Sequence, residues 1–399
     1  MADEQNLPLE GIKVIEFSHM VMGPAVGVIL ADMGAEVIKI EPLSGDSTRR
    51  LGGLGAGCFP MFNRNKKSIC LDLKSVEGLE IAHTMIKNSD IVIENFRPGA
   101  MDKLGLGYEE LKELNDRLIY CSQKGFLSGP YEHRTALDEV AQMMGGLAYM
   151  TGPPGQPLRA GASVIDIVGG MFGAIAILAA VRQREITGLG QKVQSSLFES
   201  TAFLVGQHMA QYSATGKAAD PMPMRINAWA IYDVFDTSDG EQVFVGVISD
   251  TQWLQFCDAF DLDELGEDLN YRANEDRVAR RDQLLPIVSD LFKQYSKQDL
   301  MDKLEYTGLP FAPISRPDQM FDDPHLKASG GLLDLTIPGG GKTALPALPI
   351  EMDGNKFGVR YDLPGEGEQT DEILKNYGYS EDDIEKLTAR NIIKVYEGN

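Results

Sequence analysis

The sequence predicts an α/β fold built on a doubly wound parallel sheet. Short apolar runs typical of strands alternate with helical segments between residues 13 and 126. The first such unit is strand, helix, strand, and parallel strands need a helical crossover of this kind. After about residue 212 the pattern changes to a hairpin followed by charged helical segments, which indicates a second, different region.

The opening βαβ unit is explicit in the residues. KVIEFS (13–18) and EVIKIE (36–41) are strand-like, and residues 23–34 between them are helical. Pro24 suits a first helical turn and Gly34 suits a helix end. Further strands are expected at 68–73, 90–96 and 118–126, with helices at 77–89 and 108–115.

The second half predicts more varied elements. Long helices are expected at 167–184 and 191–212, and a hairpin over 229–250 turns at Ser238-Asp239-Gly240. Helical segments continue to about Leu304, and the Pro-rich stretch 306–326 predicts a loop. The last 50 residues begin with strand-like pieces and end in an acidic helix at 379–390.

Composition limits the class of partner. The 399 residues carry a formal net charge of −22, with 43% hydrophobic and 24% charged residues, as in soluble globular proteins. Nucleic acids and anionic membranes require basic surfaces, so neither is an expected partner. The N-terminus is polar and acidic rather than signal-like, and the apolar run 167–181 is too short for a bilayer. We therefore expect a cytoplasmic protein.

Several common site types are excluded by spacing. The four cysteines form no C-x-x-C pair, which predicts free buried thiols, and the five histidines lack metal-binding spacing, so no metal site is expected. The first strand–helix turn lacks G-x-G-x-x-G, and TIPGGGKT has Thr336 where a P-loop needs glycine. No G-x-S-x-G elbow is present.

One carboxylate, Asp166, stands alone in an apolar stretch from Val164 to Val181. Ser163 and Asp166 have the spacing of a capping box, which is the structural interpretation. A buried unpaired charge costs several kcal/mol, so a chemical role is the second interpretation. The two are compatible, because a carboxylate at a helix start can both cap and react.

A locally basic region stands out in this acidic chain. It comprises Arg49, Arg50, Arg64, Lys66, Lys67, Lys74, Arg97 and Lys103. These residues lie around predicted strand ends, where α/β folds bind ligands. They are interpreted either as solvated loop charges or as a site for a phosphorylated cofactor.

The sequence resembles the family III CoA-transferases, which include formyl-CoA transferase, carnitine CoA-transferase and α-methylacyl-CoA racemase. The resemblance runs nearly end to end. It is carried, in order, by LADMGAEVIKIEP, NRNKKSICLDLK, ENFRPGAMDKLG, ASVIDIVGGMFGAIAILAA and GEQTDEIL.

The resemblance implies an acyl-CoA:carboxylate CoA-transferase with Asp166 as its nucleophile. An ionised carboxylate needs no base to attack a thioester. It would form an aspartyl–acyl anhydride and then an aspartyl-CoA thioester, and the acceptor would be a small carboxylate or dicarboxylate. Apolar surroundings would exclude water. Backbone N–H groups near Gly169 and Gly170 are candidates to stabilise the oxyanions. CoA is then a substrate, and no prosthetic group is expected.

The resemblance also implies the remaining architecture. CoA contacts are expected at Leu73, Lys74, Asn95, Phe96, Arg97 and Lys103. The large Rossmann-like domain is expected over 1–224, a small α+β domain over 225–325, and a segment at 326–399 returning to the large domain. Two chains are expected to interlock as linked rings in a homodimer.

Departures from the family pattern leave two alternatives open. The formyl-CoA branch has Gln where Val21 stands, Tyr where Leu137 stands, and a glycine-run loop that has no counterpart here. The racemase branch has a His–Asp pair at the positions of Leu137 and Asp138, so Asp138 remains here but the imidazole is missing. Racemisation needs two positioned bases. An acyl-CoA racemase or epimerase of the same fold, and a non-catalytic CoA-binding protein, therefore rank behind the transferase.

Overall fold

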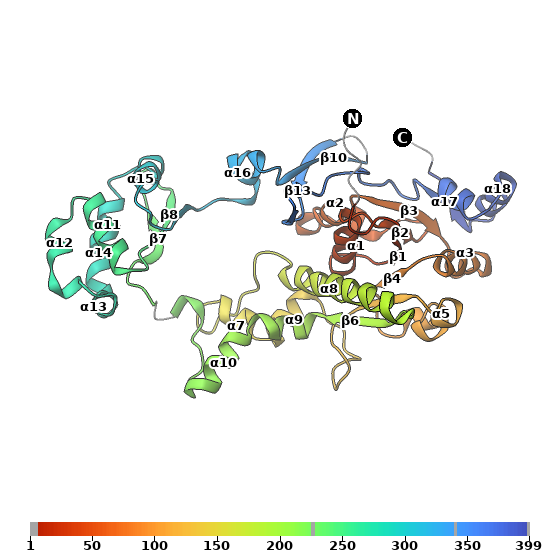
Figure 1. Cartoon of the computed structure of the whole chain (residues 1–399), viewed down its shortest axis with the longest axis horizontal. Coiled ribbons are helices and arrows are strands. Elements are labelled where there is room, and N and C mark those ends of the chain that lie inside the picture. The colour runs from red at the N-terminus through yellow and green to blue at the C-terminus, as the bar shows by residue number, and fades with distance from the viewer. Residues whose placement is uncertain (1–6, 225–227, 339–340, 397–399) are drawn as a thin grey trace. The chain divides into compact units, whose positions relative to one another are not determined.

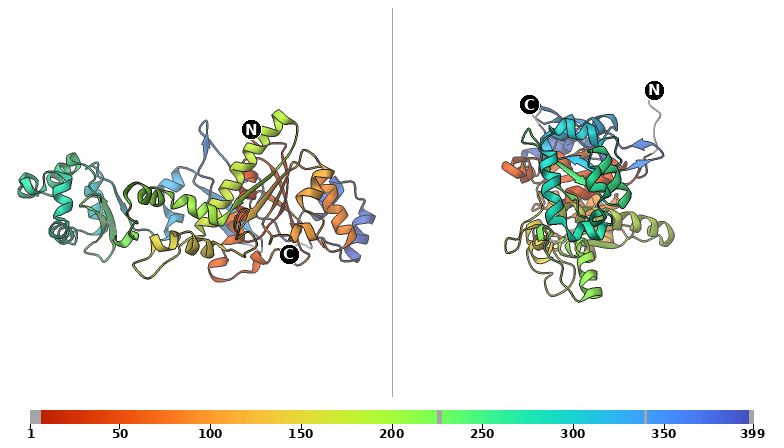
Figure 2. Two further views of the ribbon diagram at one scale, coloured as in Figure 1. Left: turned by 90° about the horizontal axis from the view of Figure 1, so that it is seen from below. Right: turned by 90° about the vertical axis from the view of Figure 1, so that its left-hand side faces the viewer.

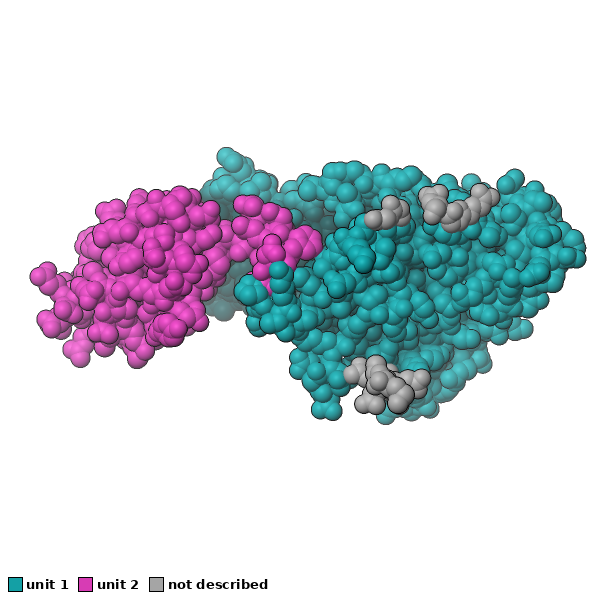
Figure 3. Space-filling view, turned by 90° about the horizontal axis from the view of Figure 1, so that it is seen from above, with its two compact units in different colours: residues 1–223, 324–399 teal, residues 224–323 magenta. Residues whose placement is uncertain are grey.

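The computed structural model describes residues 7–224, 228–338 and 341–396. The chain falls into two compact units, coloured separately in Figure 3. Unit 1 contains residues 1–223 and 324–399, and unit 2 contains residues 224–323.

Unit 1 is built on a seven-stranded sheet with the order β14-β3-β2-β1-β4-β5-β6. All neighbours pair in parallel except β14, which is antiparallel to β3. The strands are β1 (Lys13–Phe17), β2 (Glu36–Glu41), β3 (Lys66–Leu71), β4 (Ile91–Glu94), β5 (Ile119–Lys124), β6 (Lys192–Ser196) and β14 (Ile393–Lys394). The order reverses between β1 and β4, so the doubly wound parallel sheet is confirmed.

Helices cover both faces of this sheet (Figures 1 and 2). One face packs against α1 (Met22–Asp32) and α8 (Val164–Thr187). The other packs against α3 (Val76–Lys87), α5 (Tyr108–Leu114), α17 (Thr370–Asn376) and α18 (Glu381–Ala389). The strands alternate accordingly: in β1, Val14 joins the first core and Ile15 joins the second.

The predicted helix 191–212 is wrong in its first part. Residues 192–196 form β6 at the edge of the sheet, and α9 (Leu197–Leu204) and α10 (Gly206–Thr215) follow. The residues KVQSS lack the alternation of apolar and polar side chains that marks a strand. The polar Ser195 is buried, and its hydroxyl donates to the Gln123 side chain at 2.8 Å. Tertiary pairing therefore decides this strand rather than apolar alternation.

The apolar segment around Asp166 is longer than the sequence interpretation allowed. Helix α8 has 24 residues, and its most apolar 18-residue stretch has a mean hydropathy of 2.3, so by length and composition alone it is able to cross a membrane. The expectation that it is too short is therefore wrong. Its Ala174, Ile177 and Ala180 lie in the core beside the sheet, as in the central helix of a globular domain.

Unit 2 has its own core. The strands β7 (Tyr232–Asp236), β8 (Gln242–Gly246) and β9 (Phe311–Pro313) form an antiparallel sheet. Its main helices are α11 (Asp250–Ala259), α14 (Arg281–Phe292) and α15 (Lys297–Leu304), and Trp253, Phe256 and Phe292 are buried among them. The β7–β8 hairpin is confirmed, whereas the Pro-rich stretch predicted as loop supplies β9.

The described residues also form shorter α-helices and strands. They are α2 (Cys58–Phe62), α4 (Ala100–Lys103), α6 (Asp138–Met144), α7 (Leu147–Thr151), α12 (Asp263–Glu267), α13 (Asn274–Ala279), α16 (Pro324–Ala328), β10 (Leu332–Ile337), β11 (Gly341–Pro346), β12 (Glu351–Met352) and β13 (Asn355–Lys356). In the stretch TIPGGGKT, Thr336 and Ile337 end β10 and Gly341 begins β11, while Gly339 and Gly340 lie outside the described residues.

Candidate functional site

A cavity of about 670 Å³ opens in unit 1 at the carboxyl ends of the central strands. Residues 19–22 follow β1, residues 95–98 follow β4, and residues 123–125 end β5, and all three segments line it. The strand order reverses between β1 and β4, and the loops there diverge to opposite faces of the sheet. Open α/β sheets bind ligands in such crevices.

The remaining walls bring distant parts of unit 1 together. Residues 134–139 contribute the loop before α6 and its first turn, and Cys58 comes from α2. Arg159, Ser163 and Asp166 line the cavity around the start of α8. The Asp166 carboxyl group therefore stands at the meeting point of the helix start and the strand ends.

The capping box predicted for Ser163 and Asp166 is not formed. Ser163 occupies the N-cap position and Asp166 the third helical position, but no side-chain cap bond is present there. The Oδ2 atom of Asp138 instead accepts the N–H groups of Ile165 at 2.9 Å and Asp166 at 3.3 Å. A carboxylate from α6 thus caps α8, and the Asp166 side chain is not needed for that role.

Asp138 is itself held from two further sides. Its Oδ1 atom accepts a hydrogen bond from Gln142 Nε2 at 2.6 Å and lies 3.0 Å from Arg159 Nη2. Asp138 and Gln142 are both buried. This buried carboxylate joins the first turn of α6, the start of α8 and the Arg159 guanidinium.

These surroundings raise the pKa of Asp166 from 3.8 to about 7. Burial is the main cause and the negative charge of Asp138 adds to it, while the positive charge of Arg159 acts in the opposite direction. A half-buried carboxylate with such a pKa is more basic than an exposed one, and its ionised fraction is substantial at neutral pH. Asp166 is therefore a chemically competent nucleophile or proton acceptor.

Gly169 and Gly170 lie where α8 packs against α1. A Cβ atom on Gly169 would lie 2.5 Å from Met22 Cε, and one on Gly170 would lie 2.9 Å from the Met22 carbonyl oxygen. The glycines allow α8 to approach α1 closely. Because both lie inside α8, their N–H groups serve the helix, and the expectation that they stabilise oxyanions is wrong.

Three of the six residues expected to bind CoA line the cavity, namely Asn95, Phe96 and Arg97. The Asn95 amide accepts the His19 N–H at 3.1 Å and donates to the His19 carbonyl at 2.8 Å, which joins the loops after β1 and β4. The Phe96 ring lies 5.6 Å from the His19 ring. Arg97 is exposed.

The other three lie outside the lining of this cavity. Leu73 is half-buried against the core between the sheet and α3. Lys74 is exposed on a turn before α3, and Lys103 is exposed at the end of α4. Their exposed ammonium groups are accessible to an extended ligand.

Much of the basic region is neutralised internally. Arg64 pairs with Asp32 at 2.7 Å and Lys66 pairs with Glu16 at 2.8 Å, and all four side chains are buried. Three more cations of this region also form ion pairs. Arg49 pairs with Glu41, Arg50 pairs with Glu366, and Lys67 pairs with both Glu36 and Glu372. The buried pairs of Arg64 and Lys66 are therefore not solvated loop charges, whereas Arg50 is paired but 52% exposed.

Three cavity residues were not assigned a role from the sequence. Burial lowers the pKa of His19, which favours the neutral form of its imidazole. Cys58 is half-buried, unlike the fully buried Cys70, Cys121 and Cys257, and all four thiols are free. Arg159 stands seven residues before Asp166, and that short separation is the only sequence signal that points to it.

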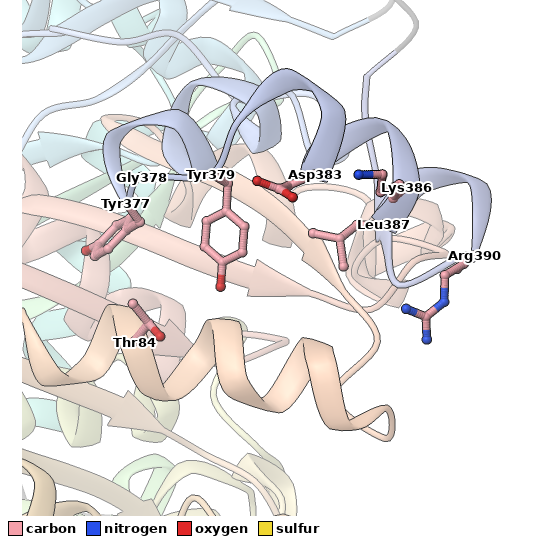
Figure 4. A pocket seen from close by; sticks show the side chains of 8 residues that line it. All are labelled: Thr84, Tyr377, Gly378, Tyr379, Asp383, Lys386, Leu387 and Arg390. Atoms are coloured by element: carbon pink, nitrogen blue, oxygen red, sulfur yellow. The ribbon is translucent and has the colours of Figure 1, made fainter.

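Other candidate sites are weaker. Within the described residues, no group of three His, Cys, Asp or Glu side chains is arranged to hold a metal ion. A second hollow of about 500 Å³ lies between α3 and the segment from Tyr377 to Arg390, where Tyr379 points toward Thr84 (Figure 4). It holds none of the predicted site residues, so the cavity at Asp166 is the candidate active site.

Comparisons with known proteins identify the family of this chain. Residues 9–370 match the model of CoA-transferase family III. The succinyl-CoA:glutarate CoA-transferase of Mus musculus is 33% identical over 398 residues, covering 98% of this chain and 91% of that protein. The acetyl-CoA:oxalate CoA-transferase of Acetobacter aceti is 35% identical over 366 residues, covering 90% and 91%.

A solved structure supports the same assignment. The crystal structure of a CaiB/BaiF family protein from Brucella suis superposes with a TM-score of 0.84 and 34% identity. The match covers 94% of this chain and all of that one.

Proposed function

Because this chain belongs to CoA-transferase family III, we propose that it moves CoA from an acyl-CoA to a small dicarboxylate, with Asp166 as the covalent carrier. The observation that carries the proposal is the Asp166 carboxyl group itself. It lines the cavity at the strand ends, and the capping role that would explain it otherwise belongs to Asp138.

In the first half-reaction, the Asp166 carboxylate attacks the thioester carbon of the acyl-CoA. The C–S bond breaks, CoA thiolate leaves, and an aspartyl–acyl anhydride forms. The thiolate then attacks the Asp166 carbonyl of the anhydride. This step forms an aspartyl-CoA thioester and releases the donor acid as a carboxylate.

The second half-reaction runs through the same steps in reverse order. The acceptor carboxylate attacks the aspartyl-CoA thioester and expels CoA thiolate, and a new anhydride links Asp166 to the acceptor. The thiolate attacks the acceptor's carbonyl, which releases the product thioester and regenerates the Asp166 carboxylate. No proton is transferred, so the cavity has to supply charge stabilisation and exclude water rather than provide an acid–base pair.

CoA binding is proposed at the loops of unit 1 that surround this cavity. The Phe96 ring offers a stacking surface for adenine, and Arg97 is an exposed cation on the cavity wall. Lys74, Lys103 and Leu73 would extend the contact to the outer parts of the nucleotide. The exposed cations Lys74, Arg97 and Lys103 suit phosphates better than Arg64 and Lys66, which are buried in ion pairs.

A dicarboxylate acceptor is proposed from the relatives, whose names specify glutarate and oxalate. The racemase alternative is weakened by Leu137, an exposed aliphatic side chain that lines the cavity beside Asp138 and transfers no proton. Deuterium exchange at the α-carbon of a 2-methylacyl-CoA separates the two activities, because the transferase chemistry leaves that proton untouched.

A homodimer is proposed to cover an apolar face of unit 1. Met171 and Ile175 on α8, Phe203 on α9 and Met209 on α10 are between 48% and 71% exposed. Phe203 also packs against Phe172 of α8, with ring centroids 5.3 Å apart, so the face continues across both helices. Burying such side chains in a second copy is favourable by about 1.5–3 kcal/mol each, and linked rings are the expected form.

Hydroxylamine trapping tests the covalent role of Asp166. Incubation of the protein with succinyl-CoA and hydroxylamine is expected to convert Asp166 to a hydroxamate, detected by mass spectrometry in the peptide containing ASVIDIVGG. Omission of the acyl-CoA is the control. Trapping at a different residue, or none with any acyl-CoA that is turned over, would contradict the proposal.

A further inference from the structure

Arg159 is built into the same cluster as the proposed nucleophile. Its Nη2 atom lies 3.0 Å from Asp138 Oδ1, while Asp138 Oδ2 accepts the backbone N–H of Asp166 at 3.3 Å. A single buried carboxylate therefore connects the guanidinium to the backbone of Asp166. Both Arg159 and Asp166 line the cavity, so the cation stands beside the reacting group on the ligand side.

The backbone on both sides of Arg159 is fixed. The N–H of Leu158 donates to the Ala148 carbonyl at 3.0 Å, and the N–H of Ala160 donates to Gln142 Oε1 at 2.8 Å. Gln142 is fully buried and also donates to Asp138. This short loop thus presents its arginine from a rigid support, which is the arrangement expected of a preorganised binding group.

The guanidinium has unused donor capacity. Nη2 also donates to the Ala162 carbonyl at 3.3 Å, whereas Nε is buried and has no hydrogen-bond partner among the described residues. A buried donor without an acceptor costs about 1–3 kcal/mol. The planar fork of a guanidinium matches a carboxylate better than any other anion-binding side chain does.

The charge on the cluster changes during the proposed reaction. In the free protein, the positive charge of Arg159 favours the ionised form of Asp166. Once Asp166 carries CoA as a thioester, its negative charge is gone and Arg159 faces the cavity without that anion. A carboxylate that enters at this stage meets a cation and no longer meets the repulsion of Asp166.

We propose that Arg159 binds the reacting carboxylate of the acceptor after Asp166 has been converted to its CoA thioester. The inference rests on the proposed covalent role of Asp166. Arg159 holds one carboxylate oxygen while the other attacks the thioester carbon of Asp166 and the C–S bond breaks. By microscopic reversibility, the same guanidinium holds the donor acid as it leaves in the first half-reaction.

Kinetics of Arg159→Gln test the assignment with succinyl-CoA as donor and glutarate as acceptor. The KM for glutarate is expected to rise tenfold or more, while the KM for succinyl-CoA changes less than twofold. Arg159→Lys, which keeps the charge and the pairing with Asp138 but lacks the fork, is expected to show a rise of a few-fold. Arg182→Gln removes the same charge from an exposed position of α8 outside the cavity lining and is expected to leave the KM for glutarate within twofold.

Direct binding provides a readout that does not depend on turnover. Asp166→Asn carries a neutral group at position 166, as the thioester does, and is expected to bind glutarate at least tenfold more tightly than the wild type by calorimetry. Asp166→Asn/Arg159→Gln is expected to lose that gain. Equal rises of both KM values in Arg159→Gln, or unchanged glutarate binding in the double variant, would show that Arg159 only supports the fold.

The failure of the underlying mechanism is recognisable separately. Arg159→Gln is expected to form the Asp166 hydroxamate from succinyl-CoA as the wild type does, because the first covalent step needs no free carboxylate. If the wild type forms no hydroxamate at Asp166, both the covalent role and the assignment of Arg159 are overturned.

Discussion

Replacing Asp166 with asparagine is expected to stabilise the fold at neutral pH while it abolishes CoA transfer. The carboxylate sits half-buried beside Asp138, and its pKa is raised from 3.8 to about 7, first by burial and then by that neighbouring charge. The cap of α8 comes from Asp138, so the substitution removes an unfavourable charge without removing a helix cap.

The magnitude follows from the linkage between protonation and folding. A pKa rise from 3.8 to about 7 corresponds to about 4 kcal/mol, since each pKa unit is worth about 1.4 kcal/mol. Partial contact with water reduces this, and we expect about 2 kcal/mol. The folded protein holds this proton more tightly than the unfolded chain does. The wild type therefore loses stability as the pH rises from about 4 to about 7, and no further loss from this group follows above that.

Thermal or denaturant unfolding of both proteins between pH 4.5 and 8.5 measures this difference. The advantage of Asp166→Asn should grow up to about pH 7 and then level off, and its turnover should fall on the order of 10⁴-fold, equivalent to about 5 kcal/mol of barrier. Glu185→Gln, at an exposed position of the same helix, should follow the wild type at every pH. An Asp166→Asn protein that is less stable than the wild type at pH 8 would mean that the carboxylate caps the helix. One that still turns over would refute its covalent role.

Three further predictions address the reaction, the CoA contacts and the assembly. The kcat/KM for acyl-CoA should rise with pH to a plateau with a midpoint near 7, because Asp166 attacks in its ionised form. Asp138→Asn should lower that midpoint and Arg159→Gln should raise it, because the two charges shift the pKa of Asp166 in opposite directions. Profiles of rate against pH measure all three. Lys74→Ala and Lys103→Ala should each raise the KM for acyl-CoA severalfold and leave that for glutarate nearly unchanged, and equal effects on both substrates would remove these lysines from the CoA site. The wild type should sediment as a dimer down to nanomolar concentration in analytical ultracentrifugation, and Ile175→Glu should yield misassembled or aggregated protein; a folded wild-type monomer would contradict the interlocked assembly.

The sequence alone predicted the features that depend on local pattern. The alternation of β1, α1 and β2 follows from periodicity and from Pro24 and Gly34 at the helix ends. Asp166 was singled out as a lone charge in an apolar helix, and it does stand in the first turn of α8. Local pattern was insufficient for β6, whose polar residues become a strand only because β5 offers an edge for pairing.

Only the tertiary structure decided which charges are free to act. Asp138 lies 28 residues before Asp166, and the hydrogen bond that transfers the cap to it has no signature in either segment. Likewise Arg64 and Lys66 look available in sequence but are neutralised by Asp32 and Glu16. Asp32 comes from the end of α1, and Glu16 reaches Lys66 because β1, β2 and β3 lie side by side in the sheet. A side chain's charge is visible in the sequence, but its partner is set by strand order and helix packing across long separations. The fold therefore decides which cations stay exposed, and it frees the Asp166 side chain from the capping role.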